Sequence, residues 1–332
     1  MKKKVFILLC IALCCLIAAF LLHFVRAGVT KNDRRDFAAE TFAGQGEMRY
    51  GMYTLFCGTD DYLTPDGVMA VRLSLENALR EGGIVPDGHY KLVASLEREV
   101  TVSRGAVAFT AIASVYFGDY HALHPDRLLA GGFPEPIEET TDFCVLDSFA
   151  AWRLFGSTDV CGMEVQIGEV YYTVAAVVEP LGDPYTGYYG LTPRVYIRYD
   201  SAAMRAENLC FTAIEGILPD PVSDFGKTAF TNAVQSYGDD VLCNTGRFSF
   251  ARVFEKLRTL SKLGVMEGKT YPYYENVSRV MESKCAMILA FEFPLYLAAG
   301  AFCIAGLLCA ILPPLRRLRQ RRQQKKKHAI LS

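Results

Sequence analysis

An apolar stretch between Ala286 and Leu312 constrains the fold of this chain more than any other feature. The run from Leu295 to Leu312 contains no charged residue, and Glu292 and Pro294 lie just before it. About 20 apolar residues in a helix cross the roughly 30 Å hydrocarbon core of a bilayer, whereas a buried helix of a soluble domain is rarely this long and uncharged. We therefore expect a transmembrane helix at residues 286–312 rather than a core helix.

A basic tail follows this stretch. Directly after two prolines come eight Lys and Arg residues: Arg316, Arg317, Arg319, Arg321, Arg322, Lys325, Lys326 and Lys327. Membrane helices keep such a basic cluster on the cytosolic side. Residues 313–332 are therefore expected to form a basic cytoplasmic tail. The tail either only fixes the topology or also binds anionic lipid or an acidic partner.

The N-terminus carries a second apolar stretch. Three lysines at positions 2–4 precede a run from Val5 to Val25 that is apolar except for His23. Such a segment is either a cleaved signal peptide or an uncleaved anchor. The run is long for a signal peptide, and Arg26 interrupts the small-residue cleavage candidate that follows. We favour a retained anchor, so that residues 1–25 form a cytoplasmic stub and the first transmembrane helix.

The segment between the two apolar stretches is acidic. The whole chain has a net charge of −1, from 35 Lys and Arg and 36 Asp and Glu. The two ends hold eleven of the basic residues and Glu292 is the one acidic residue outside the middle, so residues 26–285 carry a net charge of −11. An acidic segment between two basic ends indicates a two-pass protein of the cell membrane, with both termini cytoplasmic and the central domain extracytoplasmic. It also argues against nucleic-acid binding, which needs a basic surface.

No motif of a known catalytic or cofactor site occurs in the chain, which lacks G-x-x-x-x-G-K-[ST], H-E-x-x-H and G-x-S-x-G. His121, His124 and Asp126 form H-x-x-H-x-D, but two histidines on an irregular polar segment are usually surface residues rather than metal ligands. Asp60-Asp61 and Asp239-Asp240 suit turns better than calcium binding, because alternating oxygen ligands are missing. We expect no catalytic, cofactor-binding or metal-binding residues, and hence no enzyme.

Eleven cysteines do not form a disulfide framework. Five lie inside the apolar stretches and one at a membrane edge, which leaves five in the central segment with no C-x-x-C pair: Cys57, Cys144, Cys161, Cys210 and Cys243. One or two disulfides remain open in an oxidising compartment.

Glu292 is the one charged residue within an apolar stretch. Carboxylates inside a membrane are often functional. The alternative is that Glu292 lies at the headgroup level, with the span beginning near Leu295. The sequence leaves both readings open.

Hydrophobic periodicity in residues 26–285 predicts an extracytoplasmic α+β domain between two transmembrane helices. Expected strands cover residues 48–56, 92–102, 106–117, 143–146, 163–167, 170–178, 194–199 and 210–218; expected helices cover 64–81, 125–129, 148–155, 223–235 and 250–263. The order strand, Asp/Pro turn, helix occurs at residues 48–79 and again at 210–235. This order favours a two-part α/β lobe plus a β-rich lobe inserted at about residues 118–200.

The segment from Asp142 to Pro180 resembles the extracytoplasmic core domain of MacB-type ABC transporter permeases. That domain has a strand, a helix with Ala before Leu-Phe-Gly, a further Gly and a hairpin that ends in a valine-rich strand. The matching positions here are Ala150, Ala151, Leu154, Phe155, Gly156, Gly162 and Val170 to Val178. In this resemblance Phe155 fills the core of the lobe, while Gly156 and Gly162 permit tight turns. Cys210 to Phe225 also resembles the late segment of such domains in some clostridial-type permeases.

The chain departs from this family in one respect, because such permeases carry three more membrane helices after the domain. The resemblance therefore implies a non-enzymatic two-helix subunit that works beside a cytosolic ABC ATPase and a full-length permease, as a homo- or hetero-dimer, in contact with membrane lipid. Movement of the helices would be passed to the outer domain. Two alternatives are a membrane-anchored binding or adhesion module and a surface enzyme with an unrecognised site.

Overall fold

The computed structural model describes residues 2–31, 34–58, 63–134, 142–179, 192–201, 204, 208–222, 224–258 and 271–331. The chain divides into two compact units, which are described separately. The domain unit comprises Asn32–Ser249 and Gly264–Val280, and the membrane unit comprises Met1–Lys31, Phe250–Leu263 and Met281–Ser332. The expected Asp60-Asp61 turn and the end of the expected 250–263 helix lie outside the described residues.

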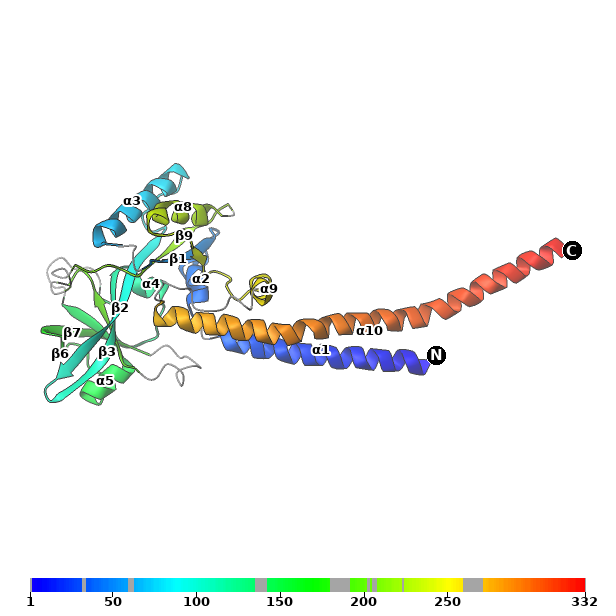
Figure 1. Ribbon diagram of the computed structural model, residues 1–332, viewed down its shortest axis with the longest axis horizontal. Coiled ribbons are helices and arrows are strands. Elements are labelled where there is room, and N and C mark those ends of the chain that lie inside the picture. Colours follow the sequence, from blue (N-terminus) through cyan, green and yellow to red (C-terminus); the bar gives the residue numbers. More distant parts are fainter. Residues whose placement is uncertain are drawn as a thin grey trace. The chain divides into compact units, whose positions relative to one another are not determined.

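The domain unit is built on a mixed ten-stranded sheet with the order β10-β1-β9-β2-β3-β8-β5-β7-β4, in which β6 pairs with both β2 and β7 (Figure 1). Its strands are β1 (Tyr50–Phe56), β2 (Lys91–Arg104), β3 (Val107–Gly118), β4 (Leu128–Gly131), β5 (Phe143–Asp147), β6 (Glu164–Ile167), β7 (Val170–Val178), β8 (Arg194–Arg198), β9 (Ala213–Pro219) and β10 (Leu242–Cys243). The pairs β3–β8 and β5–β7 are parallel, and the other pairs are antiparallel. The expected α+β class is confirmed.

Two strand–helix units lie next to each other in this sheet. Strand β1 pairs with β9, and the helices that follow them, α3 (Pro65–Glu81) and α8 (Phe225–Val234), pack against each other. Helix α3 begins where expected, because Pro65 occupies its first turn and the Thr64 hydroxyl accepts a hydrogen bond from the Gly67 amide at 3.2 Å. A Cβ at Gly82 would lie 2.6 Å from the Phe225 ring, so a larger residue at this α3–α8 contact would require the Phe225 side chain to move.

Helix α5 (Ser148–Phe155) has the bounds expected from the sequence. The Asp147 carboxylate caps it by accepting from the Ala150 amide at 2.7 Å, and its other oxygen accepts from the Arg194 amide of β8 at 3.0 Å. Gly156 ends the helix with a φ of +69°, as the motif predicts. Phe155 differs from the expectation, because it is only half-buried at the edge of the core, beneath the Arg104 guanidinium at 4.3 Å.

The expected helix at residues 125–129 is wrong. Helix α4 (Tyr120–Leu123) ends before Pro125, and Leu128 begins strand β4, which pairs with β7. Proline has no amide proton to continue the helix, and the unpaired edge of β7 offers a partner for an extended segment. Strands β4 to β8 all come from residues 118–200 and join the same continuous sheet as β1 and β9. That these residues form a separate lobe stays a prediction.

Three short helical segments complete the domain unit: η1 (Arg34–Phe37), α2 (Ala38–Ala43) and η2 (Gln235–Tyr237). Ala38 and Ala39 of α2 are buried against one face of the sheet with Met52, Val93 and Tyr196. The polar segment after the first apolar stretch therefore packs on the domain and does not remain a free linker.

The membrane unit contains α1 (Lys2–Thr30), α9 (Phe250–Arg258) and the part of α10 (Tyr273–Leu331) that follows Val280. Two segments, Lys3–Thr30 and Tyr273–Pro314, are long and apolar enough to cross a membrane. The two helices touch, since a Cβ at Gly306 would lie 3.6 Å from Leu9, and Figure 1 shows α1 alongside α10. Large apolar side chains on both helices are exposed, which suits a lipid environment: Phe6, Leu13, Phe20, Phe24, Phe291, Leu297, Ile304 and Leu307.

Candidate functional site

The histidine motif lies in the interior of the domain and not on its surface, so that expectation is wrong. His121 and His124 flank the end of α4, and the His124 side chain is 6% exposed. His121 stacks on Phe133 with ring centroids 3.9 Å apart, and its Nδ1 lies 3.7 Å from Asp126 Oδ2. Burial lowers the pKa of His121, although the nearby Asp126 opposes this effect. Within the described residues, no group of three or more His, Cys, Asp or Glu side chains is arranged to hold a metal.

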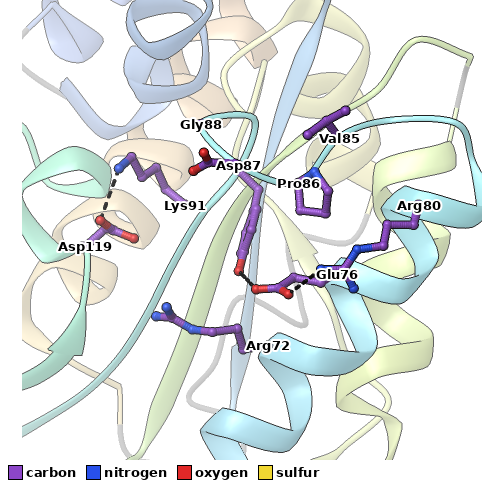
Figure 2. Close-up of a pocket in the computed structure, with 10 residues that line it drawn as sticks. Arg72, Glu76, Arg80, Val85, Pro86, Asp87, Gly88, Lys91 and Asp119 are labelled. Atoms are coloured by element: carbon purple, nitrogen blue, oxygen red, sulfur yellow. Dashed lines mark hydrogen bonds and ion pairs between the residues drawn. The ribbon is translucent and has the colours of Figure 1, made fainter.

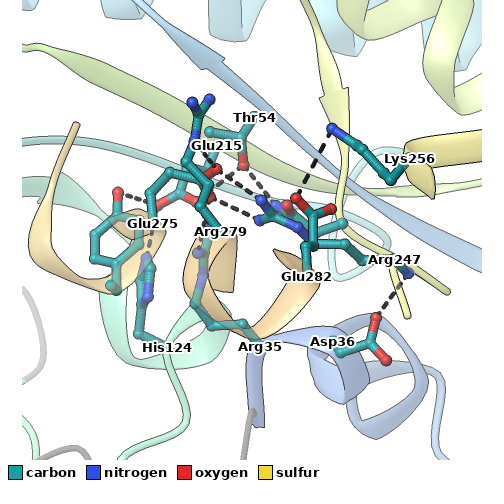
Figure 3. A network of polar contacts seen from close by, with 12 residues as sticks. Arg35, Asp36, Thr54, His124, Glu215, Arg247, Lys256, Glu275, Arg279 and Glu282 are labelled. Atoms are coloured by element: carbon teal, nitrogen blue, oxygen red, sulfur yellow. Dashed lines mark hydrogen bonds and ion pairs between the residues drawn. The ribbon is translucent and has the colours of Figure 1, made fainter. Parts of the chain in front are cut away.

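His124 belongs to a buried polar cluster centred on Glu215 of strand β9 (Figure 3). The Glu215 side chain has no exposed surface. Its Oε1 accepts hydrogen bonds from Arg35 Nη2 at 2.6 Å and from the Thr54 hydroxyl at 2.9 Å. Its Oε2 lies 2.6 Å from His124 Nε2 and accepts from the Tyr274 hydroxyl at 2.9 Å. One carboxylate therefore joins η1, β1, the end of α4 and the first turn of α10.

Glu215 retains its charge despite this burial. Burial alone would raise the pKa of its carboxyl, but the charges of His124 and Arg35, with hydrogen bonds from His124 and Thr54, hold that pKa well below its ordinary value. Both carboxylate oxygens already have two partners each. The group is thus neither reachable by a substrate nor suited to accept a proton near neutral pH, and its role is to hold the surrounding elements together.

Glu275, in the first turn of α10, forms a second buried centre next to Glu215. Arg247 donates to both of its oxygens, at 2.7 and 2.8 Å, and Arg279 Nε donates to Oε1 at 2.9 Å. Arg35 Nη1 lies 3.6 Å from Glu275 Oε2, so Arg35 bridges the two carboxylates. The Arg247 amide also donates to Asp36 at 3.0 Å. The beginning of α10 is therefore fixed to the domain by charge-assisted hydrogen bonds, which are stronger than neutral ones.

This cluster was not predicted from the sequence. A signal was present, because Glu215 interrupts the apolar strand from Ala213 to Leu218 and an unpaired charge does not remain in such a strand. Its partners could not be assigned, since they come from positions between 35 and 279.

Glu292 is the second charged feature, in the membrane unit. Its side chain is 2% exposed, its Oε2 accepts from Arg26 Nε at 3.0 Å, and its Oε1 lies 3.3 Å from His23 Nδ1. Both partners belong to α1. The single charged residue in the second apolar stretch thus pairs with the residues that end the first, and the ion pair joins the two helices.

The domain also contains a pocket of about 470 Å³ between α3 and the start of β2 (Figure 2). Six charged side chains line it: Arg72, Arg80, Lys91, Glu76, Asp87 and Asp119. Several are paired with one another, because Arg80 and the Tyr90 hydroxyl donate to Glu76 at 3.0 and 2.7 Å and Lys91 donates to Asp119 at 3.2 Å. The balanced charges suit a small polar molecule without a strong net charge.

All eleven cysteines are free thiols. Cys57 and Cys144 are buried in the domain core, whereas Cys161 and Cys210 are exposed. No disulfide therefore stabilises the domain.

The chain is similar to solved extracytoplasmic domains of ABC-type transporters. No protein-family model and no curated protein sequence matches it. The extracellular domain of the noncanonical ABC-type transporter YknZ from Gram-positive bacteria aligns with 58% of this chain and 98% of its own, with a TM-score of 0.42 and 12% identity. The periplasmic region of MacB from Actinobacillus actinomycetemcomitans aligns with 64% of this chain and 92% of its own, with a TM-score of 0.46 and 13% identity. At these identities the likeness concerns the fold alone.

Proposed function

We propose that this chain is a non-enzymatic membrane subunit of an ABC-type transport or mechanotransmission complex. In this proposal it couples a separate cytosolic ATPase to its own extracytoplasmic domain. The observation that carries the proposal is the buried Glu215–Glu275 cluster at the start of α10. The same helix continues into the apolar stretch at residues 286–312, so the link between membrane segment and domain is a helix and not a loose loop.

The cluster suits mechanical coupling for an energetic reason. Removing one partner from a buried ion pair costs roughly 3–5 kcal/mol, because the other charge remains buried and unpaired. A movement of α10 is therefore passed to η1, β1 and β9 more readily than it separates the helix from them. Glu292 and Arg26 support the same idea, since a paired α1 and α10 would move together.

The proposed topology has a cytoplasmic stub with the first membrane helix at residues 1–25, an extracytoplasmic domain at 26–285, a second membrane helix at 286–312 and a cytoplasmic tail at 313–332. The ATPase is expected on the side of this tail. A full-length permease is the proposed membrane partner, in a complex that contains one or two copies of this chain. Within the domain, residues at about 118–200 are proposed to form an inserted β-rich lobe.

An extracellular binding module is the second candidate, and the pocket beside Glu76 is the observation that favours it. A protein of this kind would use the two helices only as anchors. The two proposals differ in what the membrane segment contacts, because an anchor needs no ATPase.

Purification of the full-length chain in mild detergent from its own cell tests the proposal. We expect an ATPase and a longer permease to copurify in fixed ratio, and a variant without Arg316 to Lys327 to retain less ATPase. Recovery of the chain without either partner, or with extracellular ligands only, would contradict the proposal. If the complex is recovered, addition of ATP should change hydrogen exchange in β9, and Glu275→Gln should reduce that change while Glu179→Gln, on the surface, should not.

A further inference from the structure

Helix α9 has an apolar face that the transport proposal does not use. Phe250, Val253, Phe254 and Leu257 recur at helical spacing and lie on one side, whereas Arg252, Glu255 and Lys256 lie on the other. Val253 is 1% exposed, but Phe250 is 48% exposed. Within the membrane unit, the apolar face is therefore only partly covered by protein.

The contacts of this face place it at the edge of the second apolar stretch. The Phe254 and Phe250 rings lie 5.2 and 6.4 Å from the ring of Phe293, measured between centroids. Phe293 lies two residues before the uncharged run from Leu295 to Leu312. The aromatic side chains of α9 are thus at the level where α10 becomes fully apolar.

A second contact fixes the orientation of α9. Lys256 Nζ lies 3.8 Å from Glu282 Oε2. Glu282 precedes Phe293 by eleven residues in the same helix, which is about 16 Å along its axis. The lysine therefore points away from the apolar run and the phenylalanines point toward it. Figure 1 shows α9 nearly end-on beside α10, so the two helix axes cross.

Helix α10 exposes large apolar side chains at the same level. Phe291, two residues before Phe293, is 70% exposed, and Leu297, four residues after it, is 59% exposed. An amphipathic helix that crosses a membrane helix at this level, with its apolar face toward the hydrocarbon, has the arrangement of an interfacial helix. We propose that α9 lies in the outer membrane interface, with Phe250 and Leu257 inserted among the lipid acyl chains.

A tryptophan scan in lipid nanodiscs tests this proposal. The chain has a single tryptophan, Trp152, so Trp152→Phe gives a background without tryptophan fluorescence. Phe250→Trp places a reporter on the apolar face, and Glu255→Trp places a matched control on the polar face of the same helix. Leu257→Trp provides a second apolar position if the first variant does not fold.

Brominated acyl chains quench only tryptophans that reach them. We expect emission from Phe250→Trp or Leu257→Trp to fall about 2-fold in brominated nanodiscs relative to ordinary ones, and that from Glu255→Trp to change little, because an interfacial helix buries its apolar face by about 5–10 Å. Equal quenching at both faces, or no quenching at the apolar positions, would overturn the proposal. The result does not depend on whether an ATPase or a permease is the partner.

Discussion

Glu215 carries a negative charge inside the sheet. Replacing it measures how much the buried cluster around Glu215 and Glu275 contributes to the stability of the domain. Glu215→Gln keeps the shape but leaves Arg35 and His124 next to a neutral group. We expect the free energy of unfolding of the domain to fall by roughly 3–5 kcal/mol. Trp152 fluorescence during denaturant unfolding of the full-length chain follows this change.

A surface ion pair provides the control for that experiment. Glu179 accepts from Arg127 at 3.5 Å, and their side chains are 43% and 64% exposed. Glu179→Gln should therefore cost less than about 1 kcal/mol. If the two variants were equally stable, the buried cluster would not have the structural role assigned to it.

Asp147 makes the stability of the domain decrease as the pH rises. Burial raises its pKa from 3.8 to about 6, although the amides of Ala150 and Arg194 donate to it. Between these two values the folded domain keeps a proton that the unfolded chain has lost. Its contribution to stability is thus fully present below pH 3.8 and is lost as the pH rises through about 6. The whole shift corresponds to about 3 kcal/mol.

Asp147→Asn should remove this dependence. The variant loses stability overall, because its amide nitrogen cannot accept from the Arg194 amide, but its stability deficit relative to the wild type should shrink as the pH rises from 5 to 7. This range lies above the ordinary pKa of Glu215, whose lowered pKa stabilises the domain there without a slope. Denaturant midpoints at several pH values measure the effect, and parallel profiles for the two proteins would contradict it.

Local signals in the sequence were sufficient for single elements. Thr64 and Pro65 predict the start of α3, and Asp147 and Gly156 lie at the two ends of α5, which has the predicted bounds. Pairings between distant segments were not predictable. Strand β4 exists because β7 offers an edge, and Glu215 is stable in β9 because Arg35 reaches it from 180 positions away.

The ion pair between Arg26 and Glu292 joins α1 to α10 in apolar surroundings, so its contribution to the helix pairing can be tested by charge exchange. Leu9 lies against Gly306, so Leu9→Cys and Gly306→Cys in a chain without other membrane cysteines should form a disulfide. Glu292→Gln should lower the rate of this crosslink several-fold, since Arg26 then lacks its partner. The double exchange Arg26→Glu with Glu292→Arg should restore it.

Recovery by the double exchange is the informative outcome, because each single exchange places two like charges together. Failure of the double variant, with an unchanged rate for Glu292→Gln, would show that apolar packing alone holds the helices together. From the sequence, Glu292 could be either a functional intramembrane carboxylate or a residue at the headgroup level. Its partners could not be predicted, because His23 and Arg26 lie at the end of the other apolar stretch.

Helix α10 contributes residues to both units of the molecule. Its first residues, up to Val280, belong to the domain unit, and the rest belongs to the membrane unit. Three prolines occur within it, Pro294 and the pair Pro313-Pro314, and each removes a backbone hydrogen bond. The rigid, ion-paired end is thus at the domain, and the points where the helix bends most easily are in and beyond the apolar stretch.

The proposed topology can be tested with the native cysteines. Cys161 and Cys210 are exposed in the domain, whereas Cys57 and Cys144 are buried. A membrane-impermeant maleimide added to intact cells should label the first two, and Cys161→Ser with Cys210→Ser should abolish that signal. A cysteine introduced in the tail, Lys327→Cys, should react only after permeabilisation, because the basic tail is expected in the cytosol. Labelling of Cys161 and Cys210 only after permeabilisation would place the domain inside the cell and would remove the basis for coupling a cytosolic ATPase to an outer domain.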